Sequence, residues 1–159
     1  MSIAPTTTVD RVSDLELVVT RRVRAPARLV FRAWTTPELF RQWWLPKSLG
    51  MSLLSCEMDA RTGGTYRLLI QHPAAPEPMA FFGSYLEVTP HSRIVWTNEE
   101  SGDAGPVTTV TLEEADGATL VTVHERYPSK EALDAAGTGA AEAMGETFAQ
   151  LEALLAEPA

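Results

Sequence analysis

The sequence predicts an α+β fold in which a curved antiparallel sheet of seven strands wraps around one long C-terminal helix. Two patterns predict this fold. From residue 51 onward, strand-like runs follow one another with short connections, which favours antiparallel pairing, and a sheet of this many strands curls strongly. The run Thr138–Ala156 carries apolar residues at spacings of four, three and four, as on one stripe of a helix: Met144, Phe148, Leu151 and Leu155. The stripe can be buried against the sheet.

The chain begins with an expected tail and a first strand. Residues 1–14 are rich in Thr, Ser and Pro and lack periodicity, which indicates a flexible N-terminal tail. No shift of composition divides the remainder, so we expect one domain over residues 15–157. Apolar residues alternate along Leu15–Arg24, as in a strand, and Arg21 is the exception on the apolar face.

Two short helices and six further strands follow the first strand. Pro26 ends that strand and suits the first turn of a helix over Ala27–Trp34. Thr36 and Pro37 are typical of the start of a second short helix, which should end near Trp44. The six strand-like runs are Met51–Met58, Thr65–Gln71, Met79–Val88, Arg93–Asn98, Val107–Glu113 and Ala118–Arg126.

Composition limits the class of protein. The chain of 159 residues has a net charge of −8, which disfavours binding to nucleic acid or to an anionic membrane surface. The single cysteine, Cys56, cannot form an internal disulfide and fits a reducing compartment. The sequence shows no signal-peptide pattern and no apolar run near the ~20 residues of a membrane span. We therefore expect a soluble, cytoplasmic protein.

The sequence shows no motif for a metal or a cofactor. His72, His91 and His124 are far apart and lack metal-site spacing, and Cys56 has no CxxC partner. The GxSxG pattern of a nucleophile elbow does not occur. The glycine-containing turn Asp59–Gly64 has neither the spacing of a phosphate loop nor a helix after it. We expect no cofactor and no bound metal.

Several short motifs occur in an order typical of one family. They are Ala25-Pro26 with Val30–Glu38, then Trp43–Pro46, Glu57–Gly64, Gly83–Pro90 and His124–Pro128. In these motifs the chain resembles the AHSA-like branch, named after the activator of the heat-shock chaperone ATPase, of the START-like helix-grip superfamily (SRPBCC). The resemblance implies a sheet that grips the C-terminal helix, with a cavity between them that often holds an apolar molecule. It implies no particular reaction, since members include lipid carriers, polyketide cyclases, antibiotic-sequestering proteins and co-chaperone domains.

Aromatic side chains are the main candidates for lining such a cavity, with core packing as the alternative for each one. Trp43 lies on a short helix and is expected at the pocket mouth, whereas Trp34 is expected in a structural role. The expected ligand-binding residues are Trp43, Tyr66, Leu68, Phe81, Tyr85, Trp96, Val123, Glu125, Met144, Gly145 and Phe148. The first functional hypothesis is a carrier or sequestering protein for a small apolar or aromatic ligand.

Glu125 is the main polar candidate. It shares one face of its strand with Val123, so it faces the cavity if the valine faces the helix. A carboxylate there could serve as a general acid or base. The alternative is an ion pair with an arginine such as Arg67 or Arg126. The second functional hypothesis is therefore a polyketide cyclase-like or aromatase-like enzyme that uses Glu125 or Tyr66.

Gly145 interrupts the long helix, where glycine costs ~1 kcal/mol relative to alanine. Many relatives in the superfamily that the chain resembles have tryptophan after this glycine, where this chain has Glu146. We therefore expect the first half of the helix, with Ala140, Ala141 and Gly145, to leave space beside the pocket.

Two interactions with other proteins are also predicted. The resemblance to the chaperone-ATPase activator suggests a protein-interaction domain as the third functional hypothesis. Apolar residues on the expected outer face of the sheet suggest a homodimer: Leu69, Leu86 and Leu120.

Overall fold

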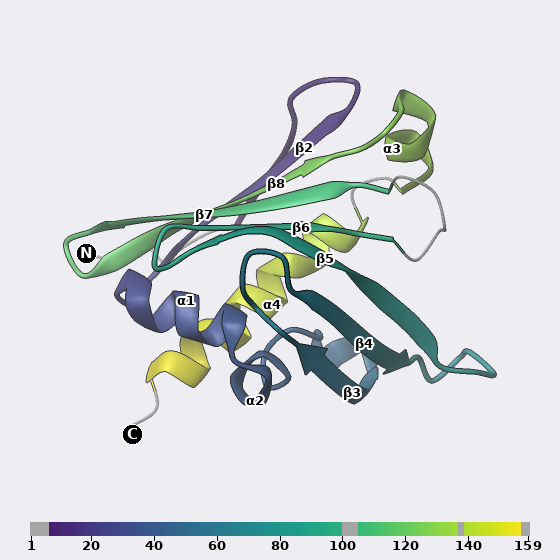
Figure 1. Cartoon of the computed structure of the whole chain (residues 1–159), viewed down its shortest axis with the longest axis horizontal. Helices are drawn as coiled ribbons and strands as arrows, with labels where there is room; N and C mark the ends of the chain where they lie inside the picture. Colours follow the sequence, from purple (N-terminus) through teal and green to yellow (C-terminus); the bar gives the residue numbers. More distant parts are fainter. Residues whose placement is uncertain (1–6, 100–104, 137–138, 157–159) are drawn as a thin grey trace.

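The computed structural model describes residues 7–99, 105–136 and 139–156. Its strands are β1 (Thr8–Arg11), β2 (Glu16–Val23), β3 (Ser52–Met58), β4 (Thr65–Gln71), β5 (Met79–Thr89), β6 (Arg93–Thr97), β7 (Val107–Ala115) and β8 (Ala118–Arg126). Its helices are α1 (Ala27–Thr35), α2 (Pro37–Phe40), the 3₁₀ helix η1 (Lys47–Leu49), α3 (Lys130–Ala136) and α4 (Gly139–Ala156). The sheet curves over α4, and α1 lies beside the C-terminal part of α4 (Figure 1).

The eight strands among the described residues form one antiparallel sheet in the order β1-β2-β8-β7-β6-β5-β4-β3. This sheet, together with the C-terminal helix, confirms the predicted α+β helix-grip fold. The predicted count of seven strands is wrong. The additional strand, β1, lies in the segment expected to be a tail and pairs with β2, with Val9 opposite Val19. Because β1 has only four residues and most of them are exposed, its sequence lacks the alternation of apolar and polar residues that predicts a strand.

The C-terminal helix buries the middle of its predicted apolar stripe, and Met144 and Leu155 at the ends of the stripe are partly buried against the core. Phe148 and Leu151 are both 0% exposed. They belong to the same hydrophobic core as Val121 and Val123 of β8, which are 0% and 2% exposed. Full burial of such side chains contributes about 1.5–3 kcal/mol each. The helix is described from Gly139, so the predicted cap at Thr138 lies outside the described residues.

Arg21 breaks the apolar alternation of β2 because it pairs with the C-terminal helix. Its guanidinium donates to Glu152 Oε1 of α4, with an Nη2–Oε1 distance of 2.6 Å, and also to Thr7 Oγ1 at 3.0 Å. The side chains of Arg21 and Glu152 are each 10% exposed. Arg24 reaches the other carboxylate oxygen from solvent, with 73% of its side chain exposed. The mostly buried pair therefore ties α4 to the N-terminal edge of the sheet.

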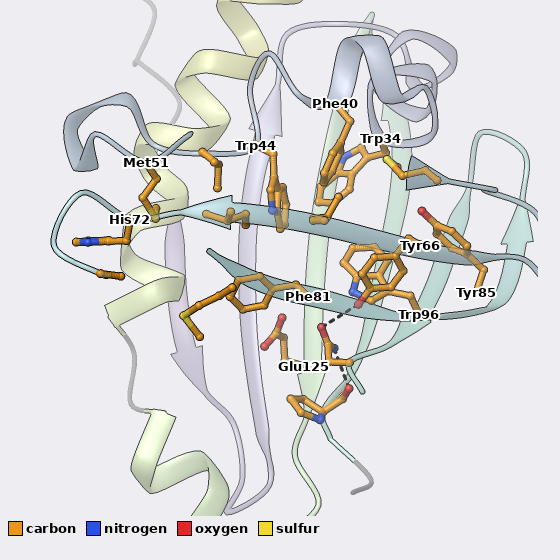
Figure 2. A pocket seen from close by; sticks show the side chains of 18 residues that line it. Trp34, Phe40, Trp44, Met51, Tyr66, His72, Phe81, Tyr85, Trp96 and Glu125 are labelled. Carbon is orange, nitrogen blue, oxygen red and sulfur yellow. Dashed lines mark hydrogen bonds between the residues drawn. The ribbon is translucent and has the colours of Figure 1, made fainter. Parts of the chain in front are cut away.

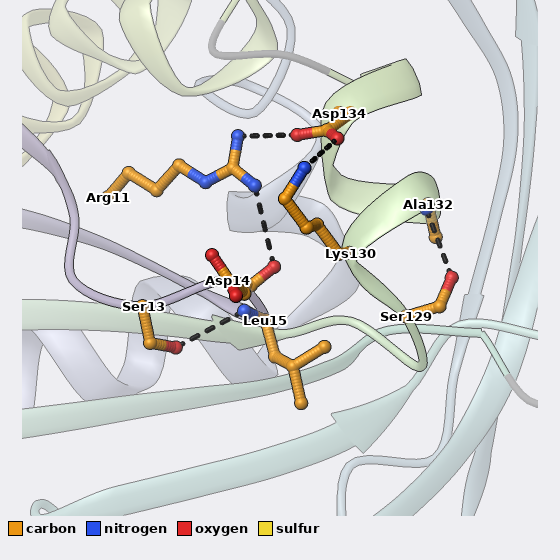
Figure 3. A network of polar contacts seen from close by, with 8 residues as sticks. All are labelled: Arg11, Ser13, Asp14, Leu15, Ser129, Lys130, Ala132 and Asp134. Carbon is orange, nitrogen blue, oxygen red and sulfur yellow. Dashed lines mark hydrogen bonds and ion pairs between the residues drawn. The ribbon is translucent and has the colours of Figure 1, made fainter.

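A polar network holds α3 against the turn between β1 and β2 (Figure 3). Arg11 contacts Asp134 at 2.7 Å, and Lys130 contacts the same carboxylate at 3.0 Å. Hydrogen bonds from Lys130 and Arg11 lower the pKa of Asp134. Since these groups are solvent-exposed, the network orients α3, and the burial of Leu133 at 1% exposure is what stabilises its packing.

Breaking the Arg21–Glu152 pair should destabilise the fold. Glu152→Ala leaves the guanidinium of Arg21 shielded from water without its carboxylate, so we expect the free energy of unfolding to fall by about 3 kcal/mol in a urea titration. Arg24→Ala is the matched control, since it removes the exposed partner of the same carboxylate and should change stability by less than about 0.5 kcal/mol. Equal losses of stability from the two substitutions would contradict the role assigned to the Arg21–Glu152 pair.

Candidate functional site

The structure contains an apolar cavity of about 580 Å³ between the sheet and the segment from α1 to the start of β3. One wall comes from that segment: Trp34, Phe40, Trp44, Leu45 and Met51. The opposite wall comes from strands and loops: Met58, Tyr66, Leu68, Ile70, His72, Ala75, Met79, Phe81, Tyr85, Trp96, Asn98, Pro106 and Glu125. Figure 2 shows labelled side chains of both walls pointing toward the space between them. The volume lies in the range of small-molecule sites.

Strand alternation explains the sheet wall. Tyr66, Leu68 and Ile70 occupy every second position of β4 and therefore share the inward face. Phe81 and Tyr85 share the inward face of β5 in the same way. The predicted lining residues that the structure places at the cavity are Tyr66, Leu68, Phe81, Tyr85, Trp96 and Glu125. Extending the β4 alternation by one step would also have identified Ile70.

A cluster of aromatic rings forms the helical wall. Phe40 and Trp44 are four residues apart and stack, with ring centroids 4.9 Å apart. Trp34 contacts Trp44 edge-on at 5.5 Å and reaches Trp96 on β6 at 5.7 Å, so the rings link the helices to the sheet. Such ring pairs contribute about 0.5–1.5 kcal/mol beyond the area that they bury. The wall is thus stiff although it comes from short helices.

The expected role of Trp43 is wrong. Trp43 is not at the pocket mouth: it is 0% exposed, and its indole N–H donates to the carbonyl of Ala33 at 3.1 Å. Trp34, expected to be structural, is 2% exposed and belongs to the hydrophobic core, and it also lines the cavity. Its Nε1 is buried and has no hydrogen-bond partner in the described part of the chain. Both rings are aromatic and buried, so sequence spacing alone could not tell which of them borders the cavity.

Polar side chains of α4 hold the segment that carries Trp44 and Leu45. Gln150 donates to the carbonyls of Trp43 and Leu45 at 3.0 and 2.9 Å. Its oxygen accepts from the backbone N–H of Lys47 at 2.9 Å. The backbone N–H of Ser48 donates to Glu146 at 2.9 Å, and hydrogen bonds with Ser48 lower the pKa of Glu146. The helix therefore positions one cavity wall from outside the cavity.

The described side chains of α4 do not line the cavity, which corrects the expectation for Met144, Gly145 and Phe148. Phe148 and Val123 are buried in the core, at 0% and 2% exposure, and neither is among the residues that line the cavity. A Cβ placed on Gly145 would lie 3.9 Å from Thr7, at the N-terminal edge of the sheet. The glycine thus faces the segment before β1 rather than the pocket.

Val123 faces the core, and Glu125, on the same face of the strand, lines the cavity. It accepts hydrogen bonds from the hydroxyls of Thr108 and Tyr127, each at 3.2 Å. Burial, and secondly the Glu125 carboxylate, raise the pKa of Tyr127 to about 12, so this phenol remains a donor at neutral pH. Arg67 and Arg126 alternate with lining residues on their strands and so lie on the outer face of the sheet.

Tyr66 joins the same polar end of the cavity. Its hydroxyl donates to the carbonyl of Thr97 at 2.7 Å and lies 3.4 Å from Asn98 Oδ1. Asn98 donates in turn to Thr108 Oγ1 at 3.1 Å. Tyr66 pairs in register with Gly83, where a Cβ would lie 2.0 Å from the oxygen of Thr97. The glycine therefore permits the close strand approach that places the Thr97 carbonyl in reach of Tyr66.

Within residues 7–99, 105–136 and 139–156, no three His, Cys, Asp or Glu side chains are grouped so that they could hold a metal ion. No helix in the same ranges combines the length and apolarity that a bilayer span requires.

Cys56 is half-buried beside Met58, and burial raises the pKa of its thiol.

The sheet, the C-terminal helix and the cavity define a helix-grip protein. The chain belongs to the family described as activator of Hsp90 ATPase homolog 1-like protein, whose model matches residues 24–156. Among curated proteins, none matches this sequence.

Solved structures from several bacteria share the fold. The protein CV1439 of Chromobacterium violaceum is 31% identical with a TM-score of 0.74, and the alignment covers 90% of this chain and 99% of that chain. A Rhodobacter sphaeroides protein is 23% identical with a TM-score of 0.83, covering 94% and 97%. The AHSA1-like protein of Aeromonas hydrophila is 15% identical with a TM-score of 0.71, covering 89% and 98%. The last two likenesses show the fold alone.

The different places of two neighbouring tryptophans predict different effects on stability. Trp43→Ala removes a fully buried ring and its hydrogen bond, so we expect the free energy of unfolding to fall by about 4 kcal/mol. Trp44→Ala removes a half-buried ring from the cavity wall, so the loss should be less than half as large. Urea unfolding followed by circular dichroism measures both. A larger loss for Trp44→Ala would show that the two roles are reversed.

Proposed function

We propose that this protein binds a small, predominantly apolar molecule in the cavity and acts as a carrier or sequestering protein for it. The observation that carries the proposal is the cavity itself, about 580 Å³ in volume and lined mostly by aromatic and aliphatic side chains. A void of this size between apolar walls forgoes dispersion contacts that a bound molecule would restore. Apolar pockets with a few placed polar groups are typical of small-molecule sites.

Three methionines support a site that adapts to its ligand. Met51, Met58 and Met79 all line the cavity, on both of its walls. The unbranched thioether side chain changes rotamer easily and packs well against aromatic rings. A pocket with rigid rings on one side and methionines around it can therefore accept ligands of somewhat different shape, as a carrier or sequestering protein requires.

The loop between β4 and β5 is the proposed entrance. His72 and Met79 are exposed and also line the cavity, so the lining reaches solvent there. Figure 2 shows Met51 and His72 at the same end of the cavity. Ala75, between them in the loop, is a half-buried lining residue with a small side chain. A ligand can enter past this loop without disturbing the core around α4.

A second candidate function is an enzyme of the polyketide cyclase or aromatase type, favoured by the carboxylate of Glu125 in the cavity wall. The hydroxyl of Tyr66 would have to leave the carbonyl of Thr97 before it could transfer its proton. Glu125 is therefore the stronger candidate for an acid or base. In that case Glu125→Gln should abolish turnover of a bound substrate while its dissociation constant stays within about threefold. Unchanged turnover would exclude this role.

Three further expectations rest on the sequence or the family name. A cytoplasmic location and a homodimer through the outer face of the sheet remain predictions, as does a chaperone-partner role suggested by the family name.

Blocking the entrance should abolish binding without affecting the fold. Ala75→Trp places an indole at the cavity mouth, so we expect the affinity for the neutral dye Nile red to fall at least about tenfold, with an unchanged thermal midpoint. Ala74→Trp is the matched control: Ala74 is exposed and outside the lining, so its affinity should equal that of the wild type.

Native mass spectrometry of the freshly purified wild type should in addition reveal a copurified small molecule. A wild type that takes up neither Nile red nor a cellular ligand would refute the proposed function.

A further inference from the structure

The charge in the wall of the cavity that we propose as the binding site is negative. Glu125 supplies a carboxylate to its wall. Among the described residues, no lysine or arginine lines the cavity, and the one histidine of the lining, His72, lies at the exposed entrance. Tyr66 and Tyr85 also line it, and burial raises the pKa of Tyr85 well above its ordinary range, so that phenol stays neutral. The site thus offers a negative charge inside an apolar space.

The carboxylate of Glu125 is held in place rather than swinging freely. Thr108 lies directly opposite Glu125 in the β7–β8 register and donates to Oε1 at 3.2 Å. Tyr127 donates to Oε2 from the other side at 3.2 Å. These two donors are neutral hydroxyls, so neither of them cancels the charge of the carboxylate that it orients. A charge fixed in an apolar environment interacts more strongly with a ligand than the same charge in water.

The aromatic wall favours the same kind of ligand. Trp34, Trp44 and Trp96 all line the cavity, and the negative face of an indole ring attracts a cation. Figure 2 shows Glu125 on the same side of the cavity as Phe81, Tyr66 and Trp96, so a group beside the carboxylate is also close to aromatic rings. An anion would meet unfavourable electrostatics from both sources. The net charge of −8 acts in the same direction at longer range.

We infer that the ligand is an organic cation: an apolar molecule with a protonated amine at one end. The ammonium group lies against Glu125, and the apolar body fills the space between the tryptophans of the helical wall and the sheet. Fatty acids and other carboxylates are rejected by the same site. This inference rests on the proposed function, since it specifies the ligand class of the same cavity.

A matched ligand series tests the inference. The four compounds are naphthylmethylamine, which is protonated at neutral pH, naphthylmethanol, ethylnaphthalene and naphthoate. They share one ring system and nearly one volume, and they differ in charge and in hydrogen-bond donation. Dissociation constants are measured by displacement of Nile red from the wild type at neutral pH and low salt. We expect the amine to bind about tenfold more tightly than ethylnaphthalene, and naphthoate about tenfold more weakly.

Variants then assign the preference to Glu125. Glu125→Gln should remove the advantage of the amine, with the affinity for ethylnaphthalene unchanged within about twofold. Glu113→Gln is the matched control, because it removes the same charge from an exposed position of β7 outside the cavity lining and should leave the ranking unchanged. If Glu125→Gln does not fold, the ranking in the wild type still decides, since it needs no variant.

The outcomes separate this inference from the proposed function. Binding of Nile red and ethylnaphthalene with no preference for the amine would overturn the cationic ligand and leave the apolar site intact. Tightest binding of naphthylmethanol would overturn it too, since hydrogen-bond donation rather than charge would then select the ligand. Tightest binding of naphthoate contradicts it directly. Failure of every compound and of Nile red to bind would overturn both proposals.

Discussion

The burial of one face of α4 against the sheet is the constraint on which the rest of the structure depends. Phe148 and Leu151 are fully excluded from water, and the mostly buried contact between Arg21 and Glu152 fixes the same helix to β2. The inward residues of β2 and β8, such as Val19 and Val123, are thereby buried in a packed core. The inward residues of β4 and β5 meet the Trp-rich segment instead, and there the packing leaves a cavity.

The cavity depends on that helix indirectly. Gln150 and Glu146 lie off the apolar stripe, and their hydrogen bonds hold the backbone of residues 43–48, which carries Trp44 and Leu45 into the cavity wall. The ring of Trp43 anchors this segment in the core through the Ala33 carbonyl. A space between apolar walls stays open because each wall is held from behind, so a ligand need not assemble its own site. Such preorganisation reduces the entropic cost of binding.

The polar groups at one end of this cavity distinguish it from a void left by imperfect packing. Withdrawing a carboxylate from water is costly unless hydrogen bonds or charges compensate it, and the half-buried Glu125 accepts hydrogen bonds from the hydroxyls of Thr108 and Tyr127. The buried indole N–H of Trp34, without a hydrogen-bond partner among the described residues, adds a cost of about 1–3 kcal/mol at the same site. Natural proteins concentrate such local costs at functional sites, which agrees with a binding role for this region.

The sequence by itself determined the fold class, the stripe of α4 and the shared strand face of Val123 and Glu125, because alternation and helical spacing are local properties of the chain. Tertiary structure decided what these patterns face. The four-residue strand β1 is defined by its partner, and Gly145 faces Thr7 because β1 lies there. Trp43 is buried without reaching the cavity, whereas Trp34 is buried and also lines it, and only three-dimensional packing distinguishes these two aromatic residues.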